Sequence, residues 1–143
     1  MFRNLKENAC FDNSDLYRLV RYSKRKITDE EINEFLKRAR KDENYNIIGY
    51  YENEIIVGLL IYKIENDSAY IEVISVEKDE RGKGIGTKLL NQIHETHKNV
   101  KVEAECDSLS VGFYKGLGFE ILNNGKNYYE EDLFRCIDIE KKE

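Results

Sequence analysis

Proline is absent from this sequence, and no segment is repetitive or of low complexity. The chain therefore has no proline-rich linker and no change in composition of the kind that separates domains. A length of 143 residues suits one ordinary domain. We expect a single domain that spans residues 1–143.

Long apolar runs are also missing. None approaches the ~20 residues of a membrane-spanning helix, and the opening MFRNLKENACF has no apolar core of a signal peptide. Hydrophobic residues make up 41% of the chain and charged residues 36%, which is typical of a globular protein with a charged surface. We expect a cytoplasmic protein without a membrane partner.

Potential metal ligands are few. The three cysteines, Cys10, Cys106 and Cys136, are too widely spaced for a disulfide framework or a zinc site, so we expect buried, reduced thiols. His94 and His97 lie three residues apart without a third ligand nearby, which indicates a solvated helix end. We predict no metal.

Basic residues are fewer than acidic ones, 23 against 28. The formal net charge is -5, which argues against nucleic acid as a partner, because binding to phosphates relies on Lys and Arg. The segment Tyr17–Lys26, with five basic residues, is a local exception. It predicts a solvated helix face with at most a phosphate-side contact.

The pattern of apolar residues predicts an α+β fold. Thr28 and Glu31 form a capping box that opens a helix, and polar turns separate three β-rich runs that would form an antiparallel meander. Helices are expected over about 12–26, 28–39, 85–97 and 108–117, and strands over 45–51, 55–64, 69–76, 100–106, 119–122 and 128–139. This order gives a mixed sheet, antiparallel at first and parallel where a helix returns the chain, flanked by about four helices.

Three alternate glycines, Gly82, Gly84 and Gly86, stand between a predicted strand and a predicted helix. Such a loop directs backbone N–H groups and the helix dipole toward one point, which suits a phosphate. The Walker pattern is absent, because no Gly-Lys-Ser/Thr string follows the required spacer. A dinucleotide fingerprint remains an alternative, with Glu103 near the position of a ribose-binding acid, but five charged residues separate Val76 from the first glycine.

The loop resembles the acyl-CoA loop of the GNAT N-acetyltransferase superfamily, whose pattern is Gln/Arg-x-x-Gly-x-Gly/Ala. Arg81, Gly84 and Gly86 match it, while Gly82 falls at a position that the pattern leaves open. A second stretch, from Asp107 to Phe119, resembles the family's Asn-x-x-Ala-x-x-Phe-Tyr-x-x-x-Gly-Phe segment. Phe113, Tyr114, Gly118 and Phe119 match, whereas Asp107 replaces Asn and Ser110 replaces Ala.

The resemblance implies acetyl-CoA as co-substrate, with the pantetheine arm entering between the strands of Val76 and Val102. It implies backbone N–H groups around Ile74–Val76 that polarise the thioester, and Lys83 and Lys88 would add charge near the pyrophosphate. The residues assigned to the coenzyme are Ile74, Ser75, Val76, Arg81, Gly82, Lys83, Gly84, Ile85, Gly86, Thr87, Asp107 and Tyr114.

The expected reaction is N-acetylation of a primary amine by direct attack in a ternary complex. Glu72 is the candidate general base, since it interrupts an apolar strand, on one face with Ile74 and Val76, that leads into the loop. Tyr114 is the candidate general acid, because a phenol stays protonated at neutral pH. An acetyl-cysteine at Cys106 is a lesser alternative.

The acceptor is a small-molecule or protein amine, and the acidic residues Glu130, Glu131 and Asp132 favour a cationic one. A homodimer is a possible assembly. The competing function is a catalytically silent GNAT-like module that binds acyl-CoA as a sensor.

Overall fold

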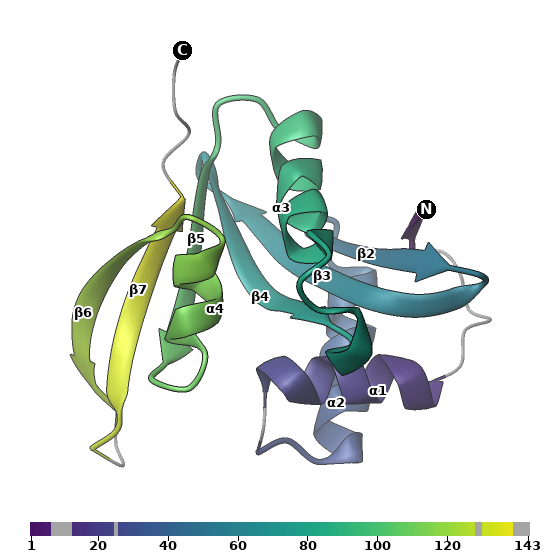
Figure 1. The fold of residues 1–143 in the computed structure, drawn as a ribbon, viewed down its shortest axis with the longest axis horizontal. Helices are drawn as coiled ribbons and strands as arrows, with labels where there is room; N and C mark the ends of the chain where they lie inside the picture. Colours follow the sequence, from purple (N-terminus) through teal and green to yellow (C-terminus); the bar gives the residue numbers. More distant parts are fainter. Residues whose placement is uncertain (7–12, 25, 128–129, 139–143) are drawn as a thin grey trace.

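A seven-stranded mixed sheet organises the fold, with strand order β1-β2-β3-β4-β5-β7-β6 (Figure 1). The computed structural model describes residues 1–6, 13–24, 26–127 and 130–138. The strands are β1 (Phe2–Asn4), β2 (Tyr45–Glu52), β3 (Ile55–Glu65), β4 (Ser68–Val76), β5 (Lys101–Asp107), β6 (Glu120–Lys126) and β7 (Asp132–Asp138). The helices are α1 (Asn13–Ser23), α2 (Asp29–Lys41), a 3₁₀ turn η1 (Lys78–Glu80), α3 (Ile85–Thr96) and α4 (Val111–Gly116).

The expected α+β class and the meander β2-β3-β4 are confirmed. Parallel pairing where a helix returns the chain is found for β4 and β5, on either side of α3, but not for β5 and β6, which are not neighbours among the described strands. The reason is the last hairpin. Helix α4 returns the chain so that β6 runs in the direction of β5, but β7 then turns back and inserts between them, antiparallel to both.

Helices cover both faces of the sheet, and each face has its own apolar core (Figure 1). On one face, α1 and α2 bury Leu16, Leu19 and Phe35 against β3 and β4. On the other, α3 and α4 bury Leu89, Ile93 and Tyr114. Within the described ranges, no helix is long and apolar enough to cross a membrane.

A local signal sets the start of α2. Thr28 accepts a hydrogen bond from the Glu31 N–H (3.1 Å), and Glu31 accepts one from the Thr28 N–H (3.2 Å), so the predicted capping box is confirmed. Strand β1, which pairs with β2, and the turn η1 were not predicted. The last strand begins at Asp132, and residues 128–129 of the predicted strand lie outside the described residues.

An opening forms where β4 and β5 separate. Their parallel pairing runs only from Ser68–Lys101 to Ile71–Ala104, and beyond it the two strands diverge (Figure 1). The edges of β4 and β5 past this point therefore have backbone groups without a neighbouring strand. The predicted gap between the strands of Val76 and Val102 is confirmed.

Candidate functional site

The glycine loop ends where helix α3 begins. Gly82 and Gly84 have positive φ angles of 83° and 81°, and Gly84 is the N-cap of α3. The first hydrogen bond of this helix runs from the Lys88 N–H to the Gly84 carbonyl (3.0 Å). The N–H groups of Ile85, Gly86 and Thr87 therefore precede the helical ladder and form an anion-binding end.

The three glycines have different roles. A side chain at Gly82 or Gly84 meets no atom within 4 Å, but the left-handed backbone favours glycine at both. Gly82, which the pattern leaves open, is thus required by the turn. Gly86 lies inside the helix, where an added Cβ would lie 3.3 Å from Leu117 Cδ2, so its small size allows α3 to approach α4.

Two adjoining cavities follow the loop into the opening. The first, of about 340 Å³, is lined by the glycine loop and by α4 residues such as Phe113. The second, of about 140 Å³, lies between the end of β4 and α4. Val76, Arg81 and Phe113 line both. A groove thus connects the N-terminus of α3 with the gap between β4 and β5.

Arg81 is the cation that lines this groove. Its Nε donates to the Val76 carbonyl at 3.0 Å, which holds the side chain across the end of β4. Lys83 instead reaches Glu80 (2.7 Å), and this hydrogen bond raises the pKa of Lys83. Lys88 lies 3.5 Å from the Tyr50 hydroxyl. Neither lysine lines the two cavities as resolved, which differs from their expected role.

The predicted residues of β4 lie in the second cavity. Ile74 and Val76 are buried in the core beneath α3, and Ser75 faces the opposite side, where its hydroxyl donates to the Leu19 carbonyl at 2.7 Å. Because β4 has lost its partner β5 here, peptide groups on that edge are open to a ligand.

Tyr114 closes the second cavity from the α4 side and is 5% exposed. Its ring packs edge-on against Phe113 and Phe119, which fixes its direction. Burial is the main cause that raises the pKa of Tyr114, and the nearby Cys106, Cys136 and Glu72 add to it. The phenol therefore holds its proton throughout the neutral range and is available as a donor.

Glu72 occupies a bulge in β4. Ile61 lies opposite Val73, whereas Tyr62 lies opposite Ile71, so Glu72 is the extra residue between them. The bulge moves Glu72 away from the face of Ile74 and Val76 that was expected from alternation. Its carboxylate instead points to the side of α1 and α2, where it accepts from Tyr45 Oη (3.3 Å) and lies 3.6 Å from Lys24 Nζ.

This carboxylate lines a separate cavity of about 570 Å³. The remaining lining residues are Lys24, Ile27, Glu30, Glu31, Glu34, Phe35, Arg38 and Tyr45. A neighbouring cavity of about 670 Å³ shares Lys24, Ile27 and Glu31 with it and reaches Asp107, Glu130, Glu131 and Asp132. Sequence reasoning did not find the part contributed by α2, because only the packing of α2 on β2 and α1 brings these residues near Glu72.

Asp107, the last residue of β5, has a structural role. Its Oδ1 accepts from the N–H groups of Leu109 and Ser110, both at 3.0 Å, and so shapes the turn into α4. Asp107 lines the cavity of about 670 Å³ and is not among the residues around the glycine loop.

Residues 19–142 match the family model of the Acetyltransferase (GNAT) domain. The chain belongs to the GNAT acetyltransferase family. This GNAT chain is 31% identical over 91 residues to N-alpha-acetyltransferase 50 of Danio rerio, a match that covers 56% of this chain and 54% of that protein. It thus spans about half the length of the curated relative.

Solved structures share the fold of the GNAT chain. An aminoglycoside 6'-N-acetyltransferase complexed with coenzyme A has a TM-score of 0.79 and 13% identity, covering 100% of this chain and 99% of its own. A GNAT acetyltransferase from Elizabethkingia anophelis with acetyl-CoA bound has a TM-score of 0.71 and 16% identity, with coverage of 96% and 95%. At these identities the likeness establishes the fold.

The alternatives lose support in this GNAT domain. Glu103 is 4% exposed and bonds to Arg135 of the neighbouring strand β7 (2.8 Å), so it supports the sheet and does not bind a ribose. Burial raises the pKa of Cys106 to about 12, which disfavours the thiolate needed for an acetyl-cysteine. Cys106 and Cys136 are buried and free, as predicted, and Cys10 lies outside the described residues.

His94 and His97 were expected to lie at a solvated helix end, but both are half-buried and bonded to side chains of the sheet. His94 Nε2 lies 2.7 Å from Asp138 Oδ2, and His97 shares a hydrogen bond of 3.1 Å with Tyr62. Both side chains thus tie the end of α3 to the sheet. In the part of the chain that the structure describes, no group of three or more potential ligands gathers around a metal site.

Proposed function

We propose that this GNAT protein is an acetyl-CoA-dependent N-acetyltransferase that acts in a ternary complex. The observation that carries the proposal is the groove that joins the N-terminus of α3 to the gap between β4 and β5. One end offers free N–H groups to an anion, and the other places a buried phenol beside an unpaired strand edge. A long donor with a diphosphate at one end and a thioester at the other suits this groove.

Each part of acetyl-CoA has proposed partners along the groove. The pyrophosphate would accept from the N–H groups of Ile85, Gly86 and Thr87, with Arg81 as the adjacent cation. The pantetheine amides would bond to the open edge of β4, as a further strand would. Backbone N–H groups near Ile74–Val76 would polarise the thioester carbonyl, since preorganised donors stabilise the negative charge that develops there.

Tyr114 and Glu72 would serve the two proton transfers. The neutral amine attacks the thioester carbon and forms the C–N bond, and the C–S bond then breaks. The departing thiolate receives a proton from Tyr114, and the proton lost by the amine passes to Glu72, directly or through water. Coenzyme A and the N-acetyl product leave, and proton exchange with solvent restores both groups.

The acceptor would be a cationic amine. The cavity beside Glu72 also contains Glu30, Glu31 and Glu34, which outnumber its cations Lys24 and Arg38. Such a cavity attracts a positively charged acceptor, and the neighbouring acidic cavity extends the same charge. The named relatives are an aminoglycoside 6'-N-acetyltransferase and an N-alpha-acetyltransferase, so an aminoglycoside amine and an α-amine are both proposed candidates.

A panel of amines tests the proposal. Acetyl-CoA is mixed with polyamines, aminoglycosides, amino acids and peptides, and thiol release is followed together with the mass of the product. We expect amine-dependent thiol release with a product heavier by one acetyl group. Binding of acetyl-CoA without release for any amine would favour the silent sensor, and absence of binding would reject both functions.

A further inference from the structure

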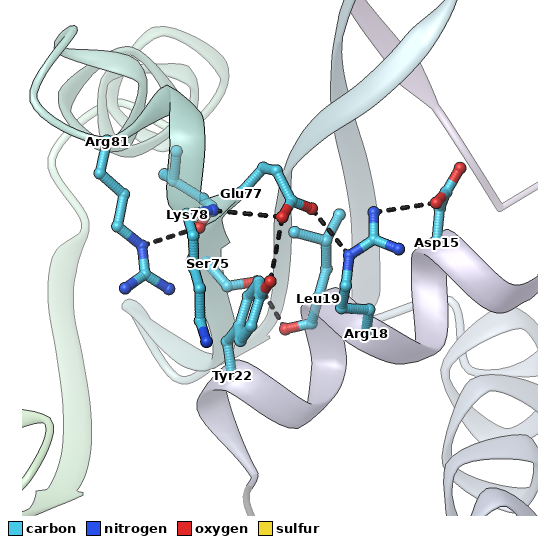
Figure 2. Close-up of polar contacts among 9 residues, drawn as sticks. Asp15, Arg18, Leu19, Tyr22, Ser75, Glu77, Lys78 and Arg81 are labelled. Atoms are coloured by element: carbon cyan, nitrogen blue, oxygen red, sulfur yellow. Dashed lines mark hydrogen bonds and ion pairs between the residues drawn. The ribbon is translucent and has the colours of Figure 1, made fainter.

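A polar network joins helix α1 to the segment that enters the glycine loop (Figure 2). Glu77 follows β4, and its carboxylate accepts from Tyr22 Oη (3.0 Å) and from Arg18 Nε (2.8 Å). Arg18 also bonds to Asp15 at 2.9 Å, one helical turn earlier. The basic segment of α1 is therefore not simply solvated, because two of its side chains hold a carboxylate of another element.

The network fixes Glu77 in its charged form. Burial opposes ionisation of this carboxyl, but the hydrogen bonds from Arg18 and Tyr22 outweigh it and lower the pKa of Glu77. Burial and the bond to Glu77 raise the pKa of Tyr22, so this phenol remains a donor. The backbone is fixed too, since the Glu77 N–H donates to the Val57 carbonyl (2.8 Å).

Tyr22 then contacts Arg81 directly. The Arg81 guanidinium carbon lies 5.0 Å from the centre of the Tyr22 ring, and Lys78 Nζ lies 5.6 Å from it. Figure 2 shows Tyr22 below the segment from Ser75 to Arg81. Arg81 is thus held at two points, by the hydrogen bond from its Nε to the Val76 carbonyl and by the Tyr22 ring. Arg81 and Tyr22 both line the second cavity.

We infer that Tyr22 is a positioning residue that sets Arg81 for the diphosphate of the donor, with Glu77 fixing the Tyr22 ring. The inference rests on the proposed function. A free arginine side chain samples many rotamers, and holding it against an aromatic ring removes part of the entropy cost of binding an anion. Neither the pattern of the glycine loop nor the cavity beside Glu72 reveals this role. Tyr22 lies some sixty residues before Arg81 in the sequence, on another element.

The test compares two donors. Acetyl-CoA carries the diphosphate, whereas S-acetylpantetheine has the same thioester arm without it. We expect Tyr22→Leu to raise KM for acetyl-CoA about tenfold with little change in kcat, and to lower kcat/KM for S-acetylpantetheine by a much smaller factor. Tyr22→Phe, which retains the ring, should restore most of the affinity. Tyr17→Leu is the control, since Tyr17 is on the same helix and bonds to Asn33 instead.

A double-mutant cycle keeps the inference falsifiable if Tyr22→Leu is also less stable. In an Arg81→Met background, Tyr22→Leu should cause no further loss of acetyl-CoA affinity. An equal loss with both donors, or a full additional loss in that background, would overturn the positioning role. If the unmodified protein failed to bind acetyl-CoA, both the proposed function and this inference would be rejected.

Discussion

Tyr114 combines deep burial with a role that needs only its proton. Because burial raises its pKa, the phenol stays protonated at neutral and mildly alkaline pH. Tyr114→Phe keeps the edge contacts with Phe113 and Phe119 and removes the donor. We expect kcat to fall about 10²-fold at unchanged acetyl-CoA affinity. Steady-state kinetics with calorimetry would check this, and an unchanged kcat would rule out Tyr114 as the acid.

The role of Glu72 as general base can be tested against Glu30, which lines the same cavity. Glu72→Gln keeps an oxygen that accepts from Tyr45 but loses the basic carboxylate. At neutral pH we expect kcat/KM for the best amine to drop at least about tenfold. Glu30→Gln removes a charge from the same lining, so it controls for attraction of a cation. If both variants lost activity equally, Glu72 would contribute charge only.

At the scale of elements, the capping box stabilises the start of α2, and α2 lines the proposed acceptor cavity. Thr28→Ala removes the acceptor for the Glu31 N–H, and we expect the free energy of unfolding to fall by about 1 kcal/mol. Thr96→Ala, at the exposed last residue of α3, is the control and should cost nothing. Urea denaturation would check the difference, and equal unfolding free energies would show that the box is unimportant.

The elements also show what the sequence could predict. Helices and the meander were predicted because their apolar periods and caps are local features. Strand β1 has only three residues, too few for an alternating pattern, and its order comes from pairing with Tyr50, Gly49 and Ile48. The bulge at Glu72 is a mismatch between two strands, so no pattern within β4 alone reveals it.

The whole molecule places the predicted donor site on one side of β4 and the acidic cavity on the other. The proposed donor site could be predicted from the sequence because its residues form two short motifs around α3 and α4. Tyr22, Tyr45 and the α2 carboxylates were not, since each belongs to the site only through tertiary packing. The proposed acceptor class therefore rests on the charged residues around a cavity that forms only when the chain folds.

Stability of the whole molecule should decline at alkaline pH. Burial raises the pKa of Tyr62 from its ordinary 10.0 to about 12, and burial also raises the pKa of Tyr45, Tyr51 and Cys136. Above pH 10 the unfolded chain loses these protons while the folded chain keeps them, so the free energy of unfolding falls as pH rises. Urea midpoints at about pH 8 and about pH 11 would measure the decline.

Tyr62→Phe isolates one of these groups. The variant should show a shallower decline between the two pH values, because it lacks a buried phenol that ionises in the unfolded chain but keeps its proton in the folded one. The variant also loses the hydrogen bond between Tyr62 and His97. This loss should lower the free energy of unfolding by a similar amount at both pH values, so it does not affect the slope. A decline as steep as that of the parent protein would contradict the assignment.

The donor site at the start of α3 is the central claim, and acetyl-CoA affinity of Gly84→Val tests it most directly. Gly84 and Gly125 both have positive φ and open space for a side chain, so Gly125→Val in β6 imposes a similar backbone strain far from the loop. Calorimetry should show at least about tenfold weaker binding for Gly84→Val and parent-like binding for Gly125→Val. Equal affinity in both variants would contradict the account.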